Sequence, residues 1–122
     1  MTHTSWLARA AFLIAVATIL WLALSPAPPV DGLSFDKANH VSAFLVLSVL
    51  ADLSFPERSS FWPAACMLIG FGGLIEVLQY WVGYRYFEVA DLAADAVGVT
   101  IYFLTRASFR ARIDPVLKNI VG

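Results

Sequence analysis

The chain has 122 residues, of which 60% are hydrophobic and only 14% charged, and its mean hydropathy is +0.75. Soluble domains average about 25% charged residues, so this composition indicates a membrane protein with a single domain over residues 1–122. The net charge of −1 and the lack of a basic stripe argue against a nucleic-acid partner, and the single cysteine excludes an intrachain disulfide.

Four apolar runs predict four transmembrane helices, at about residues 6–25, 39–55, 61–83 and 88–105. We interpret the first run as a retained helix rather than a signal peptide, because its apolar core is longer than usual. Asp36 is expected to cap the second helix, and Pro63 fits the first turn of the third. Gly70, Gly72 and Gly73 are expected to give the third helix a flat face for close helix contact, and Asp52, near the inner end of the second, is expected to be solvated beside Arg58. A basic tail occupies residues 106–122, where Pro115 is expected to break any short surface helix.

The placement of Lys and Arg predicts the orientation in the membrane. With four spans, both termini and the middle turn share one side, which holds six basic residues: Arg9, Arg58, Arg106, Arg110, Arg112 and Lys118. The opposite side holds two, Lys37 and Arg85. Because cytoplasmic segments carry the excess of basic residues, we expect both termini to lie in the cytoplasm.

Three of the predicted helices carry polar residues at helical spacing. The second has Asp36 and His40, the third has Gly72, Glu76 and Gln79, and the fourth has Glu88, Asp91, Asp95 and Gly98. Residues three or four apart share a helix face, and Glu76 and Asp95 both fall about 10 Å below the outer edge. Each ionisable group costs about 2.5–3.5 kcal/mol on insertion, so the pattern predicts an inward-facing polar site open to the non-cytoplasmic side.

An ordered set of motifs in this region resembles the VanZ-like family of bacterial membrane proteins: Asp36-Lys37-x-x-His40, Glu76-x-x-Gln79, Arg85 and Asp91-x-x-x-Asp95-x-x-Gly98. The resemblance covers residues 36–104 or so. It implies a multi-pass protein of the bacterial cytoplasmic membrane, in a family whose founding members are associated with resistance to the glycopeptide antibiotic teicoplanin. The family usually has Asn in place of Asp95 and often a second glycine in place of Tyr102, a departure that predicts looser packing at Tyr102.

The polar residues suggest a site that binds or processes an envelope lipid or an antibiotic-like ligand. Its candidates for acid–base catalysis are Glu76, His40 and Asp91, and its candidates for ligand binding are Lys37, Asp36, Gln79, Arg85 and Asp95. Lys37 and Arg85 would hold an anionic lipid or lipid-linked phosphate. A divalent cation bound by Glu76, Asp91 and Asp95 is a further option, although the spacing defines no metal.

Two other classes of protein fit the same residues. In a structural module, Glu76 would pair with Lys37 or Arg85, and the charges would fix the helices in one packing. A small transporter is the third class, but four spans without an internal repeat offer little for alternating access. The sequence leaves open whether the protein is an enzyme and what its oligomeric state is. The expected partners are the lipid bilayer and an anionic lipid or lipid-linked envelope intermediate.

Overall fold

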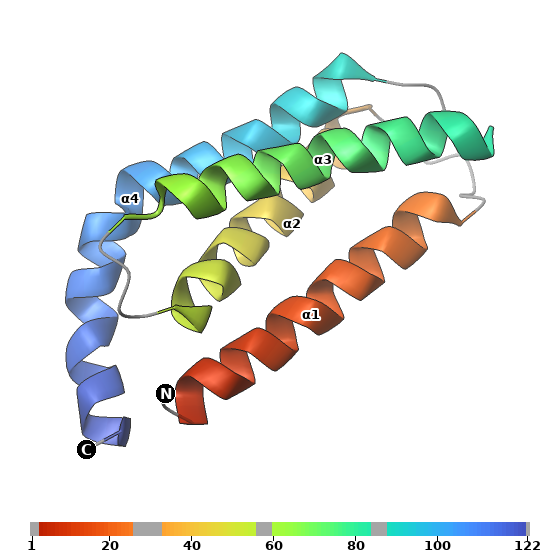
Figure 1. The fold of residues 1–122 in the computed structure, drawn as a ribbon. Helices are drawn as coiled ribbons and strands as arrows, with labels where there is room; N and C mark the ends of the chain where they lie inside the picture. The colour runs from red at the N-terminus through yellow and green to blue at the C-terminus, as the bar shows by residue number, and fades with distance from the viewer. Residues whose placement is uncertain (1–2, 26–32, 56–59, 84–87, 122) are drawn as a thin grey trace.

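The computed structural model describes residues 3–25, 33–55, 60–83 and 88–121. Within these ranges the chain forms four helices and no strand: α1 His3–Leu24, α2 Leu33–Ser54, α3 Trp62–Val82 and α4 Val89–Val121. Successive helices run in opposite directions (Figure 1). α2 packs against both α1 and α4, while α3 packs mainly against α4. The predicted all-helical class is therefore confirmed for the described part of the chain.

Two of the described helices are long and apolar enough to cross a membrane, α1 over Ser5–Leu24 and α3 over Trp62–Val82. Their outer surfaces remain apolar in the folded chain, and large side chains such as Leu13, Ile14 and Leu74 are more than half exposed. An apolar exterior of this kind suits contact with lipid better than contact with water.

The four tryptophans mark the ends of the same two helices. Trp6 and Trp21 lie toward the ends of α1, Trp62 and Trp81 toward the ends of α3, and each is more than 60% exposed. At 1.5 Å per residue, the two pairs are separated by about 22 and 28 Å along their helices, near the ~30 Å of a bilayer's hydrocarbon core. Tryptophan is typical of membrane interfaces, so these positions fit two bilayer-spanning helices.

α2 begins at Leu33, six residues before the predicted start. Asp36 therefore lies inside the helix, and the prediction that it caps the helix is wrong. The extra turns are stabilised from outside, because Lys37 forms ion pairs with Glu88 and Asp91 at the start of α4. Local capping signals could not indicate this interhelical contact.

α4 continues to Val121, although the sequence predicted an end near Thr105 and a break at Pro115. Its C-terminal part, the darkest blue in Figure 1, turns away from the line of the rest of the helix. Arg106 and Arg110 hold this part to α2, and Arg110 also lies 3.6 Å from Asp114 one turn further on. These contacts maintain the helix through the proline.

α3 ends at Val82, and the next residue, Gly83, adopts the left-handed backbone conformation, with φ of 78°. Glycine takes this conformation without a steric penalty, and it stops the helix. The three glycines inside α3 were expected to form a flat face for helix contact. A Cβ on Gly72 would lie 2.7 Å from Asp95 Oδ2, whereas Gly70 and Gly73 face open space. Only Gly72 therefore serves close packing.

Gly98 sets the closest approach of α4 to α2. A Cβ at this position would collide with the carbonyl oxygen of Val41 and would lie 3.0 Å from the amide nitrogen of Leu45. The neighbouring core is formed by buried apolar side chains from three helices: Phe44 and Leu47 of α2, Leu68 and Ile75 of α3, and Val99 of α4. A glycine is thus needed where the backbones of α2 and α4 meet.

We expect Gly98→Ala to destabilise the bundle by about 1–3 kcal/mol, the usual effect of overpacking, because both opposing groups belong to the backbone. The matched control is Gly73→Ala, where the new methyl group meets open space and helix propensity improves by up to about 1 kcal/mol. Thermal unfolding in detergent, followed by circular dichroism, measures both changes. Equal shifts for the two variants would contradict the close contact at Gly98.

Candidate functional site

The outer end of the α2–α4 interface is held by Lys37. Its Nζ lies 2.8 Å from Glu88 Oε2 and also contacts Asp91 Oδ1. Asp91 is only 4% exposed, so its charge is balanced inside the protein rather than by water. Lys37 was expected to hold an anionic ligand, but in this arrangement its ammonium is already neutralised by two carboxylates.

His40 lies one turn deeper and also bridges α2 and α4. Its Nδ1 is 2.7 Å from Asp95 Oδ1, and its Nε2 is 3.8 Å from Asp91 Oδ2. An ionised Asp95 fixes the imidazole proton on Nδ1, which leaves Nε2 as the basic nitrogen. The pair therefore has the chemistry of an oriented general base.

Glu76, the single acidic residue of α3, is fully buried, with an exposed fraction of 0%. Its Oε2 accepts a hydrogen bond from the backbone N–H of Glu88 at 3.1 Å. Its Oε1 is buried and has no hydrogen-bond partner among the described residues. Within the described ranges no Lys or Arg side chain forms an ion pair with Glu76, although His40 interacts with it electrostatically. Lys37, one of its two expected partners, is paired with other acids.

The second carboxylate oxygen of Asp95, Oδ2, contacts α3. Oδ2 is buried at Gly72 and, within the described ranges, has no hydrogen-bond partner. Electrostatic interactions link Asp95 to Asp91, His40 and Lys37. The polar faces of α2, α3 and α4 thus meet at one level, with Gly72 giving Asp95 the space to reach it.

Gln79 joins α3 to the end of α1. Its Nε2 donates a hydrogen bond to the carbonyl oxygen of Ala23 at 3.0 Å, while its Oε1 is buried without a partner in the described part of the chain. Beside it lies a groove of about 440 Å³ between α1, α2 and α3, which His40 and Asn39 also line. The rest of the lining is apolar: Ile19, Leu22, Ala23, Ala43, Phe44 and Ile75.

Two of the predicted site residues fall outside what the structure describes. Arg85 lies in the segment 84–87, and only the backbone of Asp36 is described. The structure brings together the other six: Lys37, His40, Glu76, Gln79, Asp91 and Asp95. Among the described residues, no group of three or more His, Cys, Asp or Glu side chains has an arrangement that could hold a metal ion.

A second polar cluster lies at the other end of the α2–α4 interface, and sequence reasoning missed it. Asp52 was expected to be solvated, yet it is only 4% exposed. Its Oδ2 accepts hydrogen bonds from the hydroxyl of Tyr102 at 2.5 Å and Nε of Arg106 at 3.1 Å, and its Oδ1 accepts one from Nη2 of Arg106 at 3.3 Å. Nη1 of Arg110 lies 3.9 Å from Oδ1. Both oxygens of this carboxylate are therefore satisfied.

Tyr102 fills the position where looser packing was expected. It is 2% exposed, and its ring packs edge-on against Phe61, with centroids 5.0 Å apart. The expectation was wrong because the tyrosine ring is itself buried between the helices and its hydroxyl donates a hydrogen bond to Asp52. A sequence signal for the cluster does exist: Tyr102, Arg106, Arg110 and Asp114 recur every four residues and share one face of α4.

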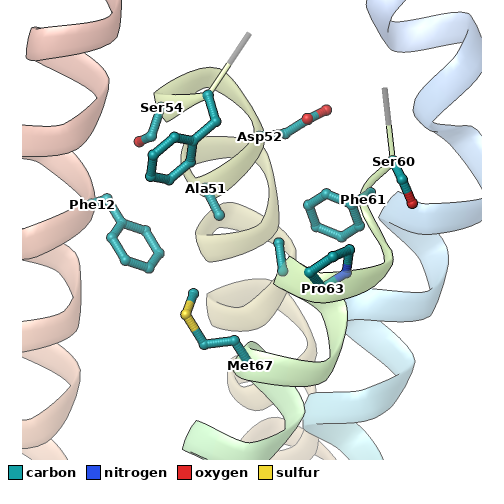
Figure 2. A pocket seen from close by; sticks show the side chains of 10 residues that line it. Phe12, Ala51, Asp52, Ser54, Ser60, Phe61, Pro63 and Met67 are labelled. Atoms are coloured by element: carbon teal, nitrogen blue, oxygen red, sulfur yellow. The ribbon is translucent and has the colours of Figure 1, made fainter. Parts of the chain in front are cut away.

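Next to Asp52 lies a smaller cavity of about 230 Å³ between α1, α2 and α3. Figure 2 shows its apolar lining, including Phe12, Phe61 and Met67, with the Asp52 carboxylate turned away from Phe12 and Met67. Because this carboxylate is directed to its partners on α4, the cavity has little polar chemistry of its own.

Apolar helices around two buried polar clusters define a class of protein, helical and associated with membranes. A sequence profile of the VanZ/LLP1 family matches residues 14–110, most of the chain, and the protein belongs to that family. Neither a curated protein nor a solved structure gives a match. Family membership and the apolar helices together indicate a membrane protein.

The two clusters should respond differently when a charge is removed. Asp52→Asn leaves Arg106 without its carboxylate and should lower stability by about 2–3 kcal/mol. Breaking a fully buried ion pair costs about 3–5 kcal/mol, and Arg106 keeps some contact with solvent. Glu76→Gln keeps an oxygen for the N–H of Glu88 and removes a buried charge that is repelled by Asp91 and Asp95 and that forms no ion pair with a described Lys or Arg, so stability should be unchanged or higher.

Thermal unfolding in detergent measures both variants against the unmodified protein. A clear loss of stability in Glu76→Gln, restored by also replacing Lys37 or Arg85 with a neutral residue, would identify Glu76 as part of a structural ion-pair network instead.

Proposed function

We propose that this protein is a four-helix, multi-pass protein of the bacterial cytoplasmic membrane that binds an amphiphilic ligand of the cell envelope. The ligand would be an envelope lipid or an antibiotic-like molecule, and its polar head would lie beside His40 and Gln79, in the groove between α1, α2 and α3. The observation that carries the proposal is the contrast between the two polar clusters. Asp52 has both oxygens bonded, whereas buried oxygens of Glu76, Gln79 and Asp95 have no partner within the described part of the chain.

That contrast favours a binding site over a purely structural network. Leaving a buried acceptor unsatisfied costs about 1–3 kcal/mol, and natural interiors satisfy nearly all such groups. Three unsatisfied oxygens at one level are therefore unfavourable for folding alone. The structural alternative explains the ion pairs of Lys37 and Asp52, but it does not explain these three oxygens.

The groove beside His40 supports an amphiphilic ligand. Its volume of about 440 Å³ falls in the range of small-molecule sites, and its lining combines apolar walls with a few polar groups. Ile19 and Leu22 of α1 form the wall that would receive an alkyl chain. His40, oriented by Asp95, would supply a base if the ligand is also processed.

All four helices are proposed to cross the membrane. α2 and α4 are less apolar than α1 and α3, but several of their ionisable groups face each other: Lys37 pairs with Asp91, His40 with Asp95 and Asp52 with Arg106. Charges paired inside a bundle are compatible with a span. The six-to-two basic bias then supports cytoplasmic termini and a polar site that opens to the non-cytoplasmic side.

Cysteine labelling tests this orientation. In a variant lacking the exposed Cys66, a membrane-impermeant reagent added outside should label Tyr84→Cys and leave Ser60→Cys and Asn119→Cys unlabelled until the membrane is opened. The basic bias is the reason for this expectation. Labelling in the reverse pattern would place the polar site on the cytoplasmic side.

Filling the groove should abolish ligand binding. Ala43 lines the groove, so Ala43→Phe would occupy its volume, whereas Ala38→Phe on the same helix adds the same ring at an exposed position. Both proteins would be purified from bacterial membranes and their retained lipids measured by native mass spectrometry. We expect a retained amphiphile on the unmodified protein and on Ala38→Phe, and its loss from Ala43→Phe.

Thermal unfolding of both variants checks that the bundle remains folded. Equal retention of lipid by all three proteins would overturn the groove as a binding site.

A further inference from the structure

The polar site is rich in acceptors and poor in donors. Within this site, and among the described residues, three buried side-chain atoms have no hydrogen-bond partner, and all three are oxygens: Glu76 Oε1, Gln79 Oε1 and Asp95 Oδ2. The identity of the Gln79 oxygen is fixed by its neighbour: Nε2 donates to the carbonyl of Ala23, and a flipped amide would bring two acceptors together. A ligand that completes this site must therefore donate hydrogen bonds.

The excess of acidic residues at this end of the bundle also favours a ligand that is positively charged. Six acidic residues fall in the half of the chain assigned to the outer side: Asp31, Asp36, Glu76, Glu88, Asp91 and Asp95. The two basic residues of that half are Lys37 and Arg85, and Lys37 is bound to two of the acids. A cleft with one sign of charge attracts ligands of the opposite sign.

An anionic head group fits these observations poorly. A phosphate ester offers acceptors to oxygens that need donors, and among the described residues it would meet several carboxylates and a lysine, Lys37, that is already paired with two of them. The sequence-based expectation of an anionic lipid depended on Lys37 being available, and its ion pairs with Glu88 and Asp91 remove that basis.

We propose that the head group is a primary ammonium, carried by an amphiphile whose alkyl chain lies in the groove between α1, α2 and α3. This inference rests on the proposed function and specifies its ligand. The ammonium donates to Gln79 Oε1 at the polar end of the groove, and the acidic cluster behind His40 supplies the attractive field. Ile19, Leu22 and Phe44 line the path of the chain.

Three probes with the same twelve-carbon chain separate charge from hydrogen bonding: dodecylammonium, dodecyltrimethylammonium and dodecyl phosphate. Titrations would use the purified full-length protein in phosphatidylcholine nanodiscs at pH 7, with binding to empty nanodiscs subtracted. We expect dodecylammonium to bind at least about tenfold more tightly than dodecyl phosphate, a difference of ~1.4 kcal/mol. Dodecyltrimethylammonium should fall between them, because it carries the charge but has no N–H group.

Gln79→Leu removes the acceptor, while the control Tyr80→Leu introduces the same leucine side chain at an exposed position on α3. The preference for dodecylammonium over its trimethyl analogue should be lost in Gln79→Leu and kept in Tyr80→Leu. Equal affinity of the unmodified protein for these two cations would overturn the role of Gln79.

Tighter binding of dodecyl phosphate, abolished by Ala43→Phe, would overturn the ammonium head group and leave the proposed function standing. Binding of every probe that is unaffected by Ala43→Phe, or no saturable binding at all, would overturn both the head group and the groove as the ligand site.

Discussion

The contact between α2 and α4 is the interaction on which the rest of the bundle depends. Gly98 brings the two backbones together near the middle, where no side chain would fit between α4 and Val41. On one side of this contact His40 meets Asp95, and on the other Asp52 meets Tyr102. A polar pair at each end and a glycine between them define the register, since sliding α4 by one turn would separate both pairs at once. α1 and α3 then cover this central pair with apolar surface.

The two ends of this contact manage buried charge in different ways. Asp52 is neutralised by Arg106 and accepts hydrogen bonds at both oxygens. These contacts offset the free-energy cost of desolvating its charge, and they hold α2 and α4 together at this end. At the other end Glu76 and Asp95 each keep an oxygen without a partner in the described chain. Functional sites commonly retain such unfavourable groups, because a ligand satisfies them later. On the proposed function, the Asp52 end would mainly stabilise the bundle, and the Glu76 end would bind the ligand.

Much of this arrangement could be predicted from the sequence, because hydrophobic runs and helical spacing are local signals. The polar face of each helix and its depth follow from counting residues, which is why Glu76 and Asp95 were expected at one level. What could not be predicted depends on contacts between helices. Asp36 has the identity of a cap, yet α2 extends past it because Lys37 meets acids on α4. Asp52 looked solvated because its partners lie about fifty residues away along the chain.

Asp95 shows how one residue can set the character of the outer site. Where the resemblance leads one to expect Asn, an amide oxygen could still accept from Nδ1 of His40, and the amide nitrogen would then lie against Gly72. Asp95 places an acceptor there instead, buried and without a described partner. Aspartate in place of asparagine therefore puts an acceptor where a donor would be, between α3 and α4. It also adds a negative charge to a group of acids. The acceptor-rich character of the site, and with it the expected preference for an ammonium head group, is thus partly a property of this chain rather than of the fold.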